Sequence, residues 1–311
     1  MLKPSWFGCS PLHPTLRVLC AAGVTVVTAL TSARAQTIPA KATDDELQIR
    51  GIFDSALPGT EQKNSLRLIV HPHMGDFHRS DYLRMPVGVR YGASDRIEVT
   101  GEVETFASHG LGHVPVFRKY GFSALHLGSK MQLGDLLHNG WATAVGFDWT
   151  RPVGQPPADI TDGLIHIAPY VSLSHRLVSA SDWRVFGALA YDEVRGTHLP
   201  MTLRKNQLGA DAPTISGGVL HERGPMTYTL EMLWTSSRVS RRFDHDVFTV
   251  RPGLVWVVPK RFTFGSDGRW VVGTGLRLSD GPDGFDVGVS MKLRANFNFR
   301  RLFKRAEKSG P

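Results

Sequence analysis

Cysteine and long apolar runs are nearly absent from this 311-residue chain, and each absence excludes a class of protein. The two cysteines, Cys9 and Cys20, both lie within the first 35 residues. That stretch reads as a secretory signal peptide, so the mature chain would contain no thiol. Cysteine nucleophiles, disulfides and Cys-based zinc sites are therefore excluded.

The signal peptide is predicted to occupy residues 1–35. Lys3 and Arg17 precede the apolar run 18–30, and Ala33-Arg34-Ala35 fits the small-residue cleavage pattern. That run is shorter than the roughly 20 residues that a membrane-spanning helix needs. No later run is longer, so a protein with this sequence could enter a membrane only as a β-barrel.

A strong excess of one charge is also lacking. The formal net charge is +8, and removal of Lys3, Arg17 and Arg34 with the signal peptide would leave about +5. Basic residues are dispersed among acidic ones except in residues 300–311, which we interpret as a basic periplasmic tail. No nucleic-acid partner is predicted from so mild a balance.

What the sequence does contain is a repeated alternation with a period of two. In LRMPVGVRYG, which begins at Leu83, apolar residues alternate with Arg84, Gly88 and Arg90. Such alternation predicts a strand with one apolar and one polar face. About twelve segments of this kind follow the polar residues 36–63; they lie near 64–75, 81–91, 96–107, 122–133, 141–151, 164–176, 183–194, 214–223, 226–236, 246–258, 262–277 and 285–299.

This pattern predicts an all-β fold: a transmembrane, antiparallel, up-and-down β-barrel of about 12 strands over residues 64–299. Residues 36–63 would form a periplasmic leader with little regular structure. Long and short connections alternate between the segments, as in outer-membrane barrels, whose periplasmic turns are short and whose external loops are long. We therefore expect the cell outer membrane as the location, with its lipid and its barrel-assembly machinery as partners.

The polar face of the predicted strands carries charges of both signs. An Arg or Lys in the middle of the lipid-facing side costs about 2–4 kcal/mol, so these residues are expected to line the lumen. They could form a packed ion-pair network or a polar conduit, and the sequence leaves both readings open. The predicted lumen-lining residues are Arg84, Arg90, Glu102, Glu104, Lys130, Asp148, Arg184, Asp192, Glu231, Arg251, Arg277, Asp286 and Lys292.

Two segments resemble a known family. LRMPVGVRYGASDRIEV and, after a loop, GFSALHLGSKMQLGD are similar to the bacterial outer-membrane barrels grouped as the meta-pathway phenol-degradation family. The matching positions are Arg90, Tyr91, Gly92, Asp95, Glu98, Gly128, Lys130, Gly134 and Asp135. The resemblance implies a transporter-like barrel, and it brings no catalytic residue with it.

Two other motifs suggest chemistry. His71, His73, Asp76 and His78 in HPHMGDFH invite a metal hypothesis, but a polar strand end and loop outside the membrane is the favoured explanation. Ser174-His175 invites a lipid hydrolase, but adjacent residues of a strand point to opposite faces. We therefore predict no catalytic residue, no metal and no cofactor, and the protein is not expected to be an enzyme.

The function predicted from the sequence is a passive channel or uptake pore for small molecules, including hydrophobic or aromatic ones. Two alternatives of different classes stay open at this point. One is an outer-membrane enzyme that acts on lipid. The other is a secreted, soluble β-sandwich that binds a partner.

Overall fold

The structure is a computed structural model in which residues 56–70, 73–75, 82–111, 113–134, 136, 140–157, 160–177, 182–201, 203, 206–238, 245–259, 262 and 269–298 are described. The chain divides into Met1–Ile38 and Pro39–Pro311, and all described residues belong to the second unit. The predicted signal peptide and the basic tail 300–311 lie outside the described residues.

The described residues form β-strands joined by turns and loops. No helix among them has the length and apolar character needed to cross a membrane. The strands are β1 (Leu66–Val70), β2 (His73–Gly75), β3 (Tyr82–Gly92), β4 (Ile97–Ser108), β5 (Tyr120–Gly134), β6 (Trp141–Pro152), β7 (Leu164–Arg176), β8 (Trp183–Gly196), β9 (Ala212–Arg223), β10 (Met226–Ser236), β11 (Asp246–Val257), β12 (Arg269–Asp280) and β13 (Asp286–Asn298).

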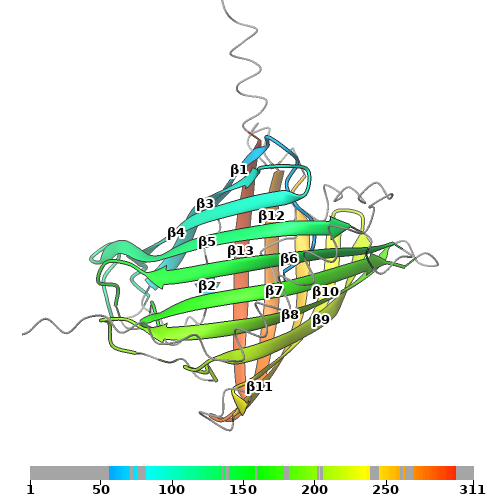
Figure 1. Cartoon of the computed structure of the whole chain (residues 1–311). Helices are drawn as coiled ribbons and strands as arrows, with labels where there is room; N and C mark the ends of the chain where they lie inside the picture. The colour runs from blue at the N-terminus through cyan, green and yellow to red at the C-terminus, as the bar shows by residue number, and fades with distance from the viewer. Residues whose placement is uncertain are drawn as a thin grey trace, which may run out of the picture. The chain divides into compact units, whose positions relative to one another are not determined.

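These strands close into a single barrel. From β3 to β13 each strand pairs with the next one in the chain, and β1 and β2 both pair with β3 and with β13. All of these pairings are antiparallel. Figure 1 shows β1, in blue, beside the orange-red β13, where the ring closes. Since β1 and β2 share one place, the ring has twelve strand positions, and the predicted up-and-down barrel is confirmed.

The strand boundaries match the alternation closely, with one clear error. The segment predicted at 262–277 corresponds to β12, which spans Arg269–Asp280. The prediction began this strand at Phe262, whose backbone N–H instead donates to the carbonyl of Pro259 in a turn. The ring of Phe262 packs near Trp256 of the preceding strand, with ring centroids 6.4 Å apart.

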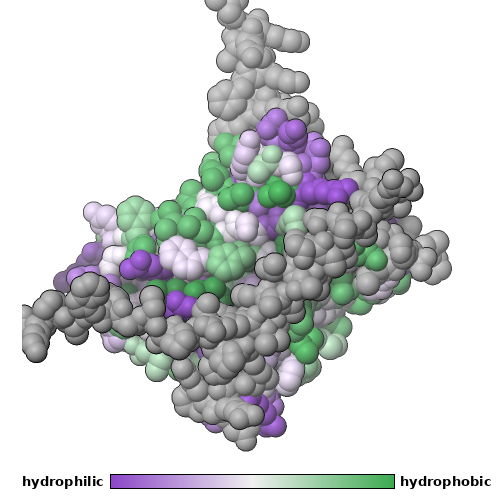
Figure 2. Space-filling model, in the orientation of Figure 1, coloured by the Kyte–Doolittle hydropathy of each residue, from purple (hydrophilic) through white to green (hydrophobic). Residues whose placement is uncertain are grey.

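The polarity of the barrel is inverted relative to a soluble protein. In β4 Glu98 is 2% exposed, while its neighbour Val99 is 47% exposed. In β10 Glu231 is 0% exposed and the adjacent Met232 is 46% exposed. Soluble proteins bury Val and Met and expose Glu. Figure 2 shows hydrophobic residues, in green, over the outer surface of the strands, with hydrophilic residues nearer their ends.

Candidate functional site

A cavity of about 790 Å³ lies against the inner face of the wall formed by β3 to β8. Its lining is polar and carries both charge signs, because every second residue of these strands faces inward. The inward side chains around it are Arg90, Glu98, Thr100, Glu102, His126, Lys130, Asp148, Thr150, His166, Tyr170 and Asp192. Ala56 and Leu57, which precede the first strand, also border the cavity.

The charges of this wall are arranged in cross-strand pairs. Arg90 Nη2 lies 4.0 Å from Glu102 Oε1, and both side chains are largely but not fully buried. Glu98 and Lys130 face each other in the register of β4 and β5. Opposite charges that face each other on neighbouring strands stabilise the register. They also keep a buried charge next to a counter-charge.

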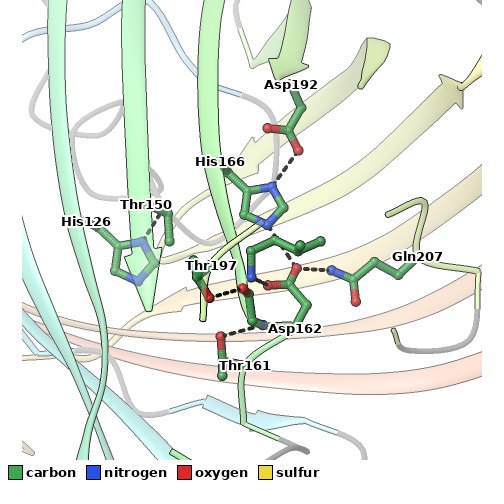
Figure 3. Close-up of polar contacts among 10 residues, drawn as sticks. His126, Thr150, Thr161, Asp162, His166, Asp192, Thr197 and Gln207 are labelled. Atoms are coloured by element: carbon green, nitrogen blue, oxygen red, sulfur yellow. Dashed lines mark hydrogen bonds and ion pairs between the residues drawn. The ribbon is translucent and has the colours of Figure 1, made fainter. Parts of the chain in front are cut away.

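A histidine on the same wall joins two strands and two connections (Figure 3). His166 Nδ1 lies 2.7 Å from Asp192 Oδ2, and His166 Nε2 lies 2.9 Å from Asp162 Oδ2. A carboxylate only accepts hydrogen bonds, so the protonated imidazole satisfies both partners at once. Asp162 also accepts from Gln207 Nε2 at 2.6 Å and from the backbone N–H of Leu164 at 3.0 Å.

These contacts change the acidity of Asp162, which lies just outside β7. Burial alone would raise the pKa of its carboxyl group above the ordinary value of 3.8. The hydrogen bonds from His166, Leu164 and Gln207 favour the carboxylate form and outweigh burial, so the pKa is lowered. Asp162 is therefore an anion at neutral pH that holds His166 and Gln207 together.

At the end of the barrel where Asp162 lies, the connection 197–211 contacts segments beyond β8 and β9, the two strands that it joins. Asn206 accepts a hydrogen bond from the N–H of Asp283 at 3.1 Å and donates from Nδ2 to the carbonyl of Gly284 at 2.8 Å. Thr197 donates to the carbonyl of Gly163 at 2.6 Å. The connection is thus attached both to the start of β7 and to the turn between β12 and β13.

The connection between β6 and β7 also turns inward. Ile160 is 2% exposed and packs with Tyr82, the first residue of β3, and Phe106, near the end of β4. Tyr82 and Phe106 meet edge to face, with centroids 5.7 Å apart. The long connections therefore occupy part of the interior at one end of the barrel.

At the other end, residues 56–61 lie inside the barrel. Leu57 belongs to an apolar cluster with Phe186, Leu220, Val255 and Val271, all on the inner face. Thr60 and Glu61 are buried as well. The sequence assigns residues 36–63 to a periplasmic leader with little regular structure; the described part forms no strand before Leu66, but its burial has no counterpart in that prediction.

Five of the thirteen predicted lumen residues are brought together at the cavity. They are Arg90, Glu102, Lys130, Asp148 and Asp192. Glu104 is buried and accepts from Ser123 Oγ at 2.7 Å. Arg84 is half-buried in β3, where it is in register with Phe106.

The remaining predicted lumen residues lie elsewhere along the ring. Arg184 Nη2 is 3.8 Å from Glu222, and Arg277 Nη2 donates to Asp286 at 2.7 Å. Glu231 and Arg251 face each other in the register of β10 and β11. Lys292 is in register with Gly273 of β12, and its side chain lies outside the described residues.

Several residues of the site are missing from the predicted set. His126, His166 and Tyr170 occupy inward positions by the same alternation, but the predicted set contains only Arg, Lys, Asp and Glu. Glu98 lies on the same inner face of β4 and is also missing from the predicted set. Leu57 could not have been found, because an isolated Leu before the first strand carries no periodic signal.

The structure describes the Ser174-His175 pair fully and the HPHMGDFH motif only in part. Ser174 is buried on the inner face, whereas His175 stacks on Trp141 with ring centroids 4.9 Å apart. The two side chains cannot act together as nucleophile and base. The HPHMGDFH motif falls mainly outside the described residues, and in the described part of the chain no group of three or more His, Cys, Asp or Glu could hold a metal ion.

Comparison with known proteins places the similarity at the level of fold. No family model matches the sequence, and no curated protein matches it. Similar solved structures include outer-membrane channels and porins. The COG4313 outer membrane channel from Pseudomonas putida F1 has a TM-score of 0.49 at 11% identity, with 79% of this chain and 100% of that chain covered.

Two porins are also similar. The KdgM porin has a TM-score of 0.43 at 9% identity, covering 74% of this chain and 99% of that one. The NanC porin has a TM-score of 0.42 at 12% identity, covering 74% and 98%. Similarity at this level is one of strand arrangement alone. Membership of the meta-pathway phenol-degradation family therefore stays a prediction.

Proposed function

We propose that this chain is an outer-membrane β-barrel that lets small solutes cross passively through its lumen. The observation that carries the proposal is the inverted polarity of the wall. Apolar side chains such as Val99, Leu127 and Met232 are nearly half exposed on the outside, while Glu98, Lys130 and Glu231 are buried inside. A surface of this kind is stable in lipid and unfavourable in water.

The interior supports passage of polar solutes. A cavity of about 790 Å³ bordered by Arg90, Lys130, Glu102 and Asp148 offers hydrogen-bond partners and both charges. Apolar solutes gain little from such a lining, so we expect small polar or charged molecules to pass more readily than apolar ones of equal size. The expectation of aromatic solutes rests on the family resemblance alone.

The two alternatives fare differently. A soluble sandwich is wrong, because the strands form one sheet that closes on itself instead of two packed sheets. An enzyme that acts on lipid lacks support from its only candidate pair, since Ser174 and His175 point to opposite sides of the wall.

Purified protein in a planar lipid bilayer tests the proposal. We expect discrete conductance steps that scale with salt concentration. Outer-membrane fractionation and slower migration after boiling in detergent gels check that the tested protein is the folded barrel. A folded barrel that never conducts in any salt would overturn the channel and leave a structural barrel.

A further inference from the structure

We propose that residues 57–61 form an internal plug that closes the lumen at the end where the short connections lie, and that the channel opens when this plug is displaced. The proposal rests on the channel function proposed above. Four observations on the described residues support it: where the segment enters, how the near wall holds it, what it touches on the far wall, and what it borders.

The segment enters the barrel over Gly92, at the last residue of β3. The N–H of Asn64 donates to the carbonyl of Gly92 at 2.7 Å, and the N–H of Gly92 donates to the carbonyl of Ser65 at 3.0 Å. A Cβ at position 92 would lie 2.0 Å from the carbonyl oxygen of Gln62. The backbone of Gly92 is not in the left-handed region, so its conformation does not require glycine. Glycine is needed here because a side chain would collide with the backbone of residues 61–62.

Charged side chains of β4 and β5 hold the backbone of the segment. Lys130 Nζ donates to the carbonyl of Leu57 at 2.7 Å. Glu98 Oε2 accepts from the N–H of Glu61 at 2.8 Å. Each contact is a charge-assisted hydrogen bond to a buried backbone group, which would otherwise be costly to leave without a partner.

An ion pair anchors the same segment to β1. Arg67 Nε lies 2.9 Å from Glu61 Oε1, and the Glu61 side chain is only 2% exposed. Thr60 Oγ1 lies 3.4 Å from Gln132 Oε1 of β5. The attachments on this side are therefore polar, and water that enters the lumen could replace each of them.

The far side of the segment reaches the opposite wall. Leu57 packs with Leu220 of β9, Val255 of β11 and Val271 of β12. In the ring β11 is six positions from β5, which supplies Lys130, so the segment bridges the full width of the lumen. Leu57 also borders the cavity.

The combination of contacts indicates a plug and not a permanent part of the wall. Residues 56–61 form no strand and add no ladder to the sheet. Leu57 contributes to the apolar cluster on the far wall, and polar groups hold the segment on the near wall. Displacement would open a path past Lys130 without breaking any strand pairing.

The first experiment compares single-channel conductance in planar bilayers. Gly92→Ala places a methyl group against the backbone of Gln62, and Lys130→Met removes the donor to Leu57. We expect each variant to raise the mean conductance by about twofold or more. Displacement of residues 57–61 widens the lumen, and the width of the lumen limits the current through a narrow barrel. The matched controls are Gly101→Ala, where a Cβ finds only Leu127 at 3.7 Å, and Lys119→Met in an exposed loop; both should conduct like the parent protein.

The second experiment follows the plug without relying on conduction. A Leu57→Cys variant of the chain that lacks Cys9 and Cys20 is labelled with a maleimide in the folded barrel. Since Leu57 is 2% exposed, labelling should be slow, and Gly92→Ala should accelerate it by about tenfold as the segment leaves its site. Gly101→Ala should leave the rate unchanged.

The outcomes separate the two proposals. Faster labelling with larger conductance supports the plug. Faster labelling in a barrel that never conducts supports the displaceable segment and overturns the channel function. Parental conductance and slow labelling in both Gly92→Ala and Lys130→Met, in folded barrels, would overturn the plug and leave residues 57–61 as fixed packing.

Discussion

Adjacent residues of one strand face different solvents in this barrel. Leu127 of β5 is 47% exposed on the outside, whereas its neighbour His126 borders the cavity and contacts Thr150 Oγ1 at 2.9 Å. A change of charge at these two positions should therefore have opposite consequences, although they are one residue apart.

We expect Leu127→Arg to impair folding into lipid and His126→Arg to be tolerated. An Arg near the middle of the lipid-facing side costs about 2–4 kcal/mol, while one in a polar lumen finds water and carboxylates. Refolding into lipid vesicles, followed by the heat-modifiable gel shift and urea titration, measures the difference. Equal loss of folded barrel in both variants would contradict the assigned facing of β5.

Stacked aromatic and histidine pairs mark the short-connection end of the wall. Trp141 stacks on His175 at 4.9 Å, and Trp183 stacks on His221 at 4.5 Å. His221 also faces Tyr228, with centroids 6.1 Å apart. Amphipathic rings prefer the level of lipid headgroups, so these pairs indicate where the apolar belt ends.

At the scale of elements, the strands follow from the sequence and the connections do not. Each strand carries its own alternation, so a period of two locates it and assigns its faces. The first predicted strand, 64–75, contains two described strands, β1 and β2, which together fill one ring position as expected. The inward course of the connections depends on single contacts such as Ile160 on Tyr82, which leave no periodic trace.

The connection 197–211 offers a test at this scale, because Asp162 ties it to the wall through Gln207. Asp162→Asn removes the anion between His166 and Gln207, and we expect a loss of about 1–3 kcal/mol from these charge-assisted hydrogen bonds. Limited proteolysis within 197–211 should become faster in the folded barrel. Glu193→Gln is the matched control, since Glu193 forms an ion pair with the exposed Arg195 of the same strand at 2.6 Å.

The same carboxylate predicts a dependence on pH. Because the pKa of Asp162 is lowered in the folded barrel, its contribution to stability is fully present above the ordinary value of 3.8. It is lost as the pH falls through the lowered pKa. Proteolysis with an acid-stable protease should thus be unchanged from pH 7 to 5 and faster only below about pH 4. An acceleration already at pH 6 would implicate another group.

At the scale of the whole molecule, the sequence predicts a barrel but not how its interior is filled. Alternation and loop lengths suffice for the ring of twelve positions. The alternation places Asp148 and Glu231 on the same inner face and predicts the same role for both. The structure distinguishes them: Asp148 is exposed at the cavity, and Glu231 is 0% exposed opposite Arg251. Whether a lumen charge serves conduction or packing depends on this three-dimensional placement.

This difference yields a prediction about selectivity. Asp148→Asn and Glu231→Gln each remove one inward carboxylate and preserve its shape. If the cavity is part of the conduit, Asp148→Asn should shift the reversal potential in a salt gradient toward anions, with about a twofold change in the permeability ratio, because one negative charge leaves the path of the ion. Glu231→Gln should leave the reversal potential at the parental value and lower the resistance of the barrel to urea, because it deprives Arg251 of a buried counter-charge. Planar-bilayer recordings in a salt gradient of roughly tenfold give the reversal potential, and urea titration gives the stability. An unchanged reversal potential in a conducting Asp148→Asn barrel would mean that ions bypass this cavity, and the assignment of Arg90, Glu102, Lys130 and Asp192 to the conduit would fail with it.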